Sequence, residues 1–383
     1  MNSIPYGKQT ISNDDIEEVV KVLKSNFLTT GPKVKEFEVV IANYCGSKYC
    51  VAVSNGTAAL HLSSLVLLKE NDKVLTTPNS FLATSNSILY AKAKPIFVDI
   101  CEDGNIDLDL CEEELKKDSN IKALYVVSFS GNMVDQEKLR YLKKTYNIKI
   151  LEDNAHAIGA KYGDIKAGSC ENSDCSIFSF HPVKNITTGE GGAITTNDKN
   201  TYEKLLSLRN HGMIKIQDMK PWEYSMTNLG FNYRLTDFQA VLGISQLHRL
   251  DEFIEKRQKI AKYYDERFEN TIVKPLYKFT ENSAYHLYVV QVDFEKAKIL
   301  KEELFRELYK RNISIQVHYI PINKQVYYKS LGYGKENTPL MDKYYFESFS
   351  IPIYPLLLEE EQEYVIKNLL ELLQKRVQGT RDA

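Results

Sequence analysis

The sequence predicts an α/β protein, with a mostly parallel sheet covered by helices on both faces and a smaller α+β domain after it. Over the first two thirds of the chain, short apolar runs alternate with segments of helical period. This alternation is typical of parallel strands joined by helical crossovers. After residue 193, longer helical segments and scattered strands replace it. The 383 residues, 43% of them hydrophobic and 26% charged, suffice for two or three domains.

The same periodicity places the individual elements in chain order. Strands are expected at 50–53, 74–77, 95–98, 123–128, 149–152, 175–180 and 193–196. Helices are expected between several of them at 58–68, 83–91, 108–117 and 136–146, and then at 201–209. A long helical pattern with room for a break follows at 237–266. Further on we expect strands near 285–292 and 313–318, and helices near 296–309 and 360–374.

The change of pattern sets the expected domain boundary. Residues 1–250 should form the large domain, together with a short N-terminal segment, and residues 251–383 the small α+β domain. The boundary falls inside the long helical stretch, between 245 and 265. Residues 379–383 have no apolar pattern, and we expect them to be disordered.

Charge and cysteine content argue against several classes of protein. Lys and Arg total 49 and Asp and Glu 51, so no strong basic field exists to hold a nucleic-acid backbone. No run approaches 18 apolar residues and the polar N-terminus lacks a signal-peptide layout, so we expect a cytoplasmic protein with no membrane span. The six cysteines are spaced neither as a disulfide framework nor as metal ligands, and we expect free thiols.

Four polar clusters stand near expected strand ends, which is where α/β sheets bind their ligands. The first is SNGTAA at 54–59, between a strand and a helix. Its glycine, small side chains and hydroxyl leave free backbone N–H groups at a helix start, which suits a phosphate. An ordinary helix N-cap has the same pattern. The cluster matches neither GxxxxGK[ST] nor GxGxxG, which disfavours the nucleotide-binding folds.

The second cluster is EDNAHA at 152–157, directly after an apolar strand. The Asp153 carboxylate would point into the crevice at the strand end, although a helix N-cap explains it equally well. His156 lies three residues further on. Taken alone, His156 fits a core or capping role better than a functional one.

The third cluster is SFHPVKNITTGEGG at 179–192, a loop between two apolar strands. A surface lysine is the default interpretation of Lys184. A lysine drawn into a site among small and polar residues, however, can lose its proton and form a Schiff base. The glycines would let the backbone approach a ligand closely.

The fourth cluster is GFNYRLT at 230–236, just before the long helical stretch. Asn232 supplies an amide donor, and Arg234 supplies a guanidinium that suits a carboxylate or a phosphate. A plain helix-entry loop with Thr236 as the N-cap is the alternative.

In this order and spacing, the runs SNGTAALHL, EDNAHAIGA, SFHPVKNITTGEGGA and GFNYRLTD resemble the DegT/DnrJ/EryC1/StrS family over residues 4–375. The resemblance implies fold type I, the aspartate aminotransferase fold, with a three-layer α/β/α large domain. It also implies pyridoxal 5′-phosphate (PLP, or PMP in the amino form) as cofactor. Within the family, the HPVK run and SFLATSN, DGNID and QVHYIP are most similar to the aminotransferase of the pseudaminic acid pathway. That similarity implies amino transfer from glutamate to C4 of a UDP-linked 4-keto-6-deoxy-N-acetylhexosamine.

The resemblance also implies roles for single residues at matching motif positions. Lys184 would hold PLP as a Schiff base and move the proton during transfer. Asp153 would pair with the pyridine nitrogen, because an ionised carboxylate keeps that nitrogen protonated. The implied cofactor-binding residues, apart from Lys184, are Gly56, Thr57, Ala58, Phe81, Asp153, His156, Ser179 and Asn232.

Asn232 would reach the cofactor phosphate of a neighbouring subunit, which implies a homodimer with a shared active site. His181, Arg234 and His318 would lie on the substrate side, and no metal is implied. Related 3-dehydratases carry His at the position of Lys184, so this lysine indicates a transaminase. The alternatives are an aminotransferase of the same family for a bacillosamine- or perosamine-type sugar, and a catalytically silent protein on the same fold.

Overall fold

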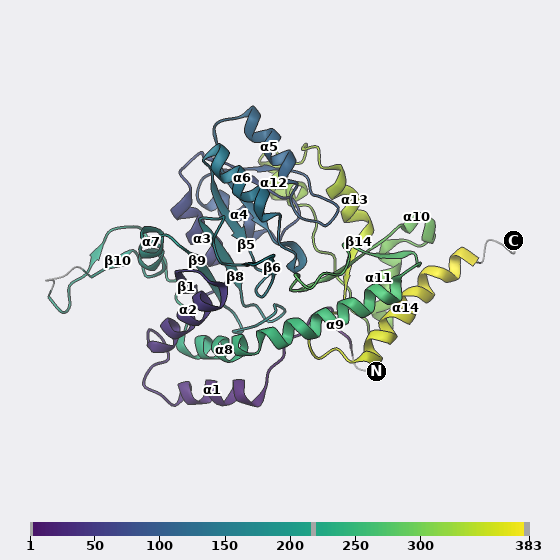
Figure 1. Ribbon diagram of the computed structural model, residues 1–383, viewed down its shortest axis with the longest axis horizontal. Helices are drawn as coiled ribbons and strands as arrows, with labels where there is room; N and C mark the ends of the chain where they lie inside the picture. The colour runs from purple at the N-terminus through teal and green to yellow at the C-terminus, as the bar shows by residue number, and fades with distance from the viewer. Residues whose placement is uncertain (1–2, 216–219, 379–383) are drawn as a thin grey trace.

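The computed structural model describes residues 3–215 and 220–378, and the expected disordered tail 379–383 lies outside this part (Figure 1). Its centre is a seven-stranded sheet of order β1-β9-β8-β5-β4-β2-β3. β9 runs antiparallel to both neighbours and the other pairs are parallel. All seven predicted strands are confirmed, with no end shifted by more than two residues. They are β1 (Tyr49–Val53), β2 (Lys73–Thr76), β3 (Lys94–Phe97), β4 (Ile121–Val127), β5 (Lys149–Asp153), β8 (Cys175–Ser179) and β9 (Gly192–Thr196).

Helices cover both faces of this sheet, as the α/β prediction requires. Strand side chains alternate between the faces: Val51 and Val53 pack with α3, whereas Cys50 and Ala52 pack with α2. The predicted crossover helices are present as α3 (Gly56–Leu67), α4 (Ala83–Tyr90), α5 (Leu108–Lys117) and α6 (Gln136–Tyr146), and the next helix is α7 (Lys199–Arg209).

Two N-terminal helices were not predicted, α1 (Asn13–Leu23) and α2 (Pro32–Cys45). Their ends carry local signals: Ser12 and Asp15 form a capping box, and α2 has Pro32 in its first turn and Gly46, at φ 81°, as its C-cap. Both helices pack on α8 (Asp237–His248). The long helical pattern does break, at Arg249, before α9 (Leu250–Phe268).

The C-terminal part is built on an antiparallel sheet of order β12-β13-β14. Residues 313–318 were expected to be a strand, and this is wrong. Ile313 and Gln316 form only isolated bridges, to Ile4 and Ser350, because the segment turns away from the sheet toward the crevice. The strands are β12 (Val273–Pro275), β13 (Tyr288–Val292) and β14 (Ser348–Ile351), and the helices are α10 (Phe294–Ala297), α11 (Lys301–Lys310), α12 (Val326–Ser330), α13 (Pro339–Glu347) and α14 (Glu359–Gln378).

The remaining elements are short. The expected helix at 296–309 is divided into α10 and α11. Two small hairpins stand apart from the main sheets: β6 (Lys161–Tyr162) with β7 (Ile165–Lys166), and β10 (Met213–Ile214) with β11 (Ser225–Met226). Two 3₁₀ turns are η1 (Phe129–Gly131) and η2 (Ile322–Lys324).

α9 links the two parts of the molecule (Figure 1). Phe253 near its start belongs to the core beside the large sheet, whereas Tyr264 and Phe268 near its end belong to the core of the small sheet. Ile4 also packs in the small-sheet core. The division into residues 1–250 and 251–383 stays a prediction.

Three further findings concern side chains and helices of the described residues. All six cysteines are free thiols, and all but Cys101 are buried. Within residues 3–215 and 220–378, no helix combines the length and apolar character needed to cross a bilayer. Over the same ranges, no group of three or more His, Cys, Asp or Glu side chains is placed to hold a metal ion.

Candidate active site

A cavity of about 720 Å³ opens at the carboxyl ends of the parallel strands. Parallel strands all end at the same edge of a sheet, so the segments that follow them meet there. The lining comes from the segments after β1 and β2 and from the ends of the central strands β4, β5 and β8. The segment 316–320 and the N-terminal Tyr6 close the opposite side.

Lys184 lies on the loop between β8 and β9, held in a turn in which its backbone N–H donates to the His181 carbonyl at 2.9 Å. The residue is open to the cavity, but protein surrounds its amine. The resulting loss of solvation lowers the pKa of Lys184 to about 8, against the opposing effect of Asp153. A fraction of this amine is therefore neutral at physiological pH.

Asp153 is the last residue of β5, and only 4% of it is exposed. One carboxylate oxygen accepts a hydrogen bond from the Thr84 hydroxyl at 2.6 Å and the other from the Ala155 N–H at 3.1 Å. Burial raises the pKa of Asp153, although these two bonds and Lys184 lower it. A cation bound in the cavity would stabilise the ionised form of this buried carboxyl group.

The start of α3 forms the third side of the site. Asn55 caps the helix by accepting the Ala58 N–H at 2.8 Å, and the N–H groups of Gly56 and Thr57 precede the helix's own hydrogen-bond ladder. A Cβ on Gly56 would lie 2.9 Å from Ser179 Cβ, so glycine is needed to bring the helix this close to the end of β8. The arrangement suits a phosphate.

His156 already has partners for both ring nitrogens. Nδ1 accepts from the Ser130 N–H at 3.3 Å, and Nε2 lies 3.0 Å from the Tyr319 hydroxyl. This pattern assigns the ring proton to Nε2, which donates to Tyr319. Burial holds the pKa of His156 well below its usual value, so the ring is neutral.

Most of the predicted site residues meet in this cavity. Ala58, Asn232 and Arg234 are not part of its lining; Asn232 is exposed, and Arg234 donates to the Asn210 side chain at 2.7 Å. Their loop lies beside the first cluster, because Tyr233 accepts the Ser54 N–H. The predicted residues that do line the cavity are Gly56, Thr57, Phe81, Asp153, His156, Ser179, His181, Lys184 and His318.

Several lining residues were missed by the sequence prediction. Tyr319 follows His318 in a motif that was singled out, yet no role was given to it. His286 is 4% exposed, its ring centroid lies 4.5 Å from that of His156, and its Nδ1 has no hydrogen-bond partner among the described residues. Nothing in the sequence near His286 or Tyr6 marks either of them.

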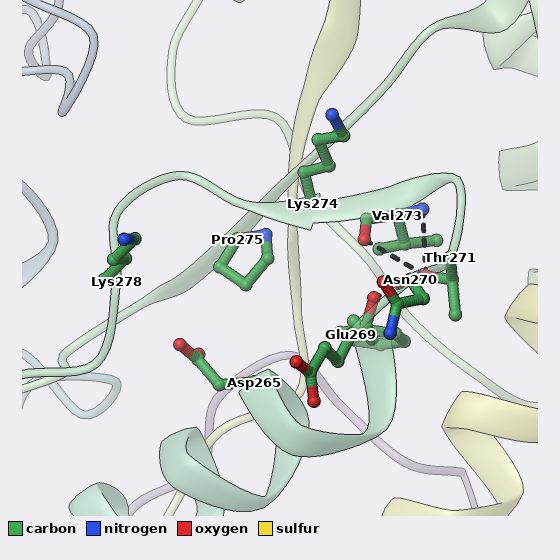
Figure 2. Close-up of a pocket in the computed structure, with 9 residues that line it drawn as sticks. Asp265, Glu269, Asn270, Thr271, Val273, Lys274, Pro275 and Lys278 are labelled. Carbon is green, nitrogen blue, oxygen red and sulfur yellow. Dashed lines mark hydrogen bonds between the residues drawn. The ribbon is translucent and has the colours of Figure 1, made fainter.

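A second cavity, of about 500 Å³, lies at the end of α9 (Figure 2). It is lined by Asp265, whose two carboxylate oxygens accept hydrogen bonds from the Tyr288 hydroxyl and the Phe279 N–H. Figure 2 shows Lys274 extending away from Glu269. The charged side chains at the edge of this second cavity therefore do not point toward a common position. We therefore place the functional site in the larger cavity.

The lining of the larger cavity fits PLP. The buried Asp153 carboxylate can pair with a protonated ring nitrogen, the Lys184 amine is partly neutral, and the start of α3 can receive the phosphate. Phe81 is 59% exposed and can cover an aromatic ring face.

Similar proteins agree with this assignment. A transaminase of Campylobacter jejuni named for UDP-4-amino-4,6-dideoxy-N-acetyl-β-L-altrosamine is 40% identical over 98% of this chain and 99% of its own. The aminotransferase PseC of Helicobacter pylori, involved in pseudaminic acid biosynthesis, superposes with a TM-score of 0.92 at 30% identity, over 98% of this chain and 100% of its own. The PMP form of the putative sugar aminotransferase Spr1654 from Streptococcus pneumoniae superposes with a TM-score of 0.89 at 29% identity. The superposition covers 99% of this chain and 100% of Spr1654.

The family model spans almost the whole described chain. It matches residues 9–370 and includes all four polar clusters. The chain therefore belongs to the DegT/DnrJ/EryC1/StrS aminotransferase family.

Proposed function

We propose that this protein transfers an amino group from glutamate to C4 of a UDP-linked 4-keto-6-deoxy-N-acetylhexosamine, in pseudaminic acid biosynthesis, with PLP as cofactor. The observation that supports it most is the pairing of Lys184 with Asp153 in one cavity, with a phosphate-binding helix start beside them. The names of the relatives from Campylobacter jejuni and Helicobacter pylori, 40% and 32% identical, support the sugar.

Each residue has a distinct task in this reaction. PLP, when bound, supplies the electron sink for the carbon that loses its proton. Lys184 Nζ removes that proton from the amino acid and, in the second half-reaction, delivers one to C4 of the sugar. Its lowered pKa suits both roles, because the amine has to alternate between neutral and charged forms near neutral pH.

The other lining residues bind the cofactor and the substrate and orient them. Asp153 keeps a proton on the ring nitrogen, the start of α3 and Ser179 bind the phosphate, and Phe81 covers the ring. His181, Arg234 and His318 are proposed for the substrate side. Burial lowers the pKa of His156, His286 and His318, so these rings are neutral and add no positive charge beside Lys184.

We propose further that the enzyme is a homodimer whose subunits share each active site, and that it acts in the cytoplasm, where an enzyme of nucleotide-sugar metabolism is expected. Asn232 lies outside its own cavity, which fits a contact with a partner's phosphate. The β10–β11 hairpin, at the left of Figure 1, projects from the body of the molecule. It carries exposed apolar side chains suited to burial against a second subunit, namely Trp222, Tyr224 and Met226.

The visible spectrum tests the cofactor and the donor together. The purified protein should have an absorbance band of lysine-bound PLP that excess glutamate bleaches. The bleached enzyme should then aminate a UDP-linked 4-keto-6-deoxy-N-acetylhexosamine faster than bacillosamine- or perosamine-type keto sugars. A protein that stays colourless with added PLP would contradict the proposal.

A further inference from the structure

We infer that His61 is a positioning residue for the cofactor phosphate in the partner subunit's site, acting through Tyr233 on the direction of Asn232. This inference rests on the proposed function, in which Asn232 reaches the phosphate of a neighbouring subunit. His61 lies on α3, just after the first polar cluster, and has no role in the reaction as proposed so far.

The backbone around Asn232 is held by the end of α7. The N–H groups of Phe231 and Tyr233 donate to carbonyls there at 2.7 and 3.1 Å, and Asn232 forms an isolated bridge with Asn210. Side chains alternate along such an extended segment. The rings of Phe231 and Tyr233 accordingly stack on one side, with centroids 5.0 Å apart, whereas Asn232 is exposed. The direction of Asn232 therefore depends on where its two flanking rings are held.

His61 contacts both of these flanking rings. Its Nδ1 lies 3.1 Å from the Tyr233 hydroxyl, and its ring centroid lies 4.8 Å from that of Phe231. Burial lowers the pKa of His61 and raises the pKa of Tyr233, so both groups are uncharged near neutral pH. The phenol thus keeps its proton and donates it to Nδ1, which leaves the ring proton of His61 on Nε2.

α3 gives His61 a fixed starting point for these contacts. Tyr90 of α4 meets the His61 ring edge to face, with centroids 5.3 Å apart. The Ser54 N–H, just before α3, donates to the Tyr233 carbonyl at 2.9 Å. The loop is therefore attached to α3 at two points, once by the backbone and once by the His61 side chain.

These contacts assign His61 to the partner's site rather than to its own. His61 lies one helical turn after Thr57, yet it is not among the described residues that line the cavity of its own subunit. The interactions of its ring among the described residues are with the 231–233 loop and α4. The start of α3 is fixed separately, by the Asn55 cap.

The first test titrates the cofactor-free protein with PLP and follows the absorbance band of lysine-bound PLP. His61→Ala should weaken PLP binding about fivefold, because the loss of one hydrogen bond between neutral groups frees the loop that directs Asn232. His61→Asn offers an amide oxygen near the position of Nδ1 and should restore the affinity to within about twofold. Asn232→Ala removes the phosphate contact itself and should weaken binding at least about tenfold.

Two further variants check the path and the specificity of the effect. Tyr233→Phe removes only the hydroxyl, and adding it to His61→Ala should cause no further loss, because both changes remove the same hydrogen bond. His248→Ala is the matched control, since His248 is an exposed histidine in the last turn of α8 and outside the cavity lining. It should leave the PLP affinity within about twofold of that of the unchanged enzyme.

Subunit exchange shows which site His61 serves. When equal amounts of His61→Ala and Lys184→Ala are mixed, the band arises only from sites whose Lys184 belongs to a His61→Ala subunit. In a hybrid dimer, such a site receives Asn232 from a subunit with an intact His61. About half of the absorbing sites should then regain the unchanged affinity. Exchange with a subunit that carries both substitutions is the control and should give no recovery.

The remaining results decide against the inference. Unchanged PLP affinity in His61→Ala overturns it, and so does a loss that subunit exchange does not relieve, which would place His61 in its own subunit's site. If His61→Ala fails to fold, Tyr233→Phe takes its place in the titration and the mixture, and the same two results overturn the inference. Unchanged affinity in Asn232→Ala overturns the shared site, and this inference with it. A protein that forms no band with PLP overturns the proposed function itself.

Discussion

Lys184 and Asp153 determine each other's charge because both are enclosed by protein. Desolvation lowers the pKa of the amine and raises that of the carboxyl, whereas their mutual attraction opposes both shifts. A ligand that brings a protonated ring nitrogen to Asp153 adds a second cation, which favours the ionised carboxylate. The pair is thus suited to a cofactor that has a cationic ring nitrogen, which Asp153 would contact, and an electrophilic carbon, which the Lys184 amine would attack.

The lowered pKa of Lys184 predicts how covalent attachment of PLP to the cofactor-free protein depends on pH. The neutral amine is the nucleophile, so the rate should rise with pH and level off above about 8, rather than near the usual 10.5. Stopped-flow absorbance of the protein mixed with PLP between pH 6 and 10 measures it. A rate still rising steeply at pH 10 would refute the assignment.

Removing the Lys184 amine should abolish the reaction without abolishing the binding of PLP. Lys184→Ala should lower both half-reactions by at least about 10³-fold, because general acid–base catalysis and covalent attachment are both lost. PLP should still bind noncovalently, through the start of α3 and Asp153. Dialysis followed by absorbance measures retention, and full transaminase activity in this variant would exclude Lys184 as the proton carrier.

Asp153→Asn tests the pairing with the ring nitrogen. The amide has the same shape and can keep a bond with Thr84, but it cannot hold a proton on the ring, so both half-reactions should slow about 100-fold or more. Single-turnover absorbance checks this. Asp265→Asn is the control, because Asp265 is a half-buried carboxyl whose pKa is also raised by burial, but it lines the second cavity (Figure 2). Equal effects of the two variants would show that the loss is structural.

α9 carries one buried cation that holds the backbone of two segments of the C-terminal part. Arg257, in the middle of the helix, is 1% exposed and donates to the carbonyls of Tyr285, His286 and Ile353 at 3.2, 3.3 and 2.9 Å. No carboxylate compensates its charge in these contacts, and burial lowers the pKa of Arg257 to about 9. The contact fixes the backbone of His286, which lines the candidate active site.

Arg257→Met should therefore lower the free energy of unfolding by about 3 kcal/mol, since the buried carbonyls lose their donor. Urea denaturation followed by circular dichroism measures the change. Arg306→Met is the control on an exposed helix position of α11, with its side chain 64% exposed, and should change stability by less than about 0.5 kcal/mol. A similar small change in Arg257→Met would show that water replaces the guanidinium.

The positions of Lys184 and Asn232 relative to the cavity predict how two subunits would share an active site. Lys184 lies in its own cavity and Asn232 lies outside it, so a shared site would combine Lys184 of one subunit with Asn232 of the other. Lys184→Ala and Asn232→Ala should each be impaired, yet a mixed dimer contains one site with both residues intact. Random mixing makes half of the dimers hybrid, so about a quarter of the full activity should return.

Subunit exchange of the two purified variants, followed by the amination assay, measures this recovery. A mixture of Lys184→Ala with Asp153→Asn is the control. Lys184 and Asp153 line the same cavity of one subunit, so each site of a mixed dimer carries one of the two defects, and no recovery is expected. Recovery in neither mixture would mean that Asn232 does not serve a partner's site.

The sequence by itself determined the central sheet and the chemical core of the site. Apolar strands, helical periods and caps are local signals, and parallel strands must end at one edge, so Thr57, Asp153 and Lys184 could be placed together without coordinates. The joint motif pattern also indicated the family, which the comparisons confirm.

Only the tertiary structure decided the course of residues 313–318 and the contacts between residues that are far apart in the sequence. Residues 313–318 have a strand-like pattern, yet they leave the sheet because packing against Ile4 and the crevice stabilises another course. His286 and Tyr319 contact His156, and Tyr6 contacts His318, across more than a hundred residues of chain, and no sequence spacing predicts such contacts. The proposed catalytic pair, Lys184 and Asp153, follows from local sequence pattern, whereas the opposite wall of the cavity follows from long-range packing.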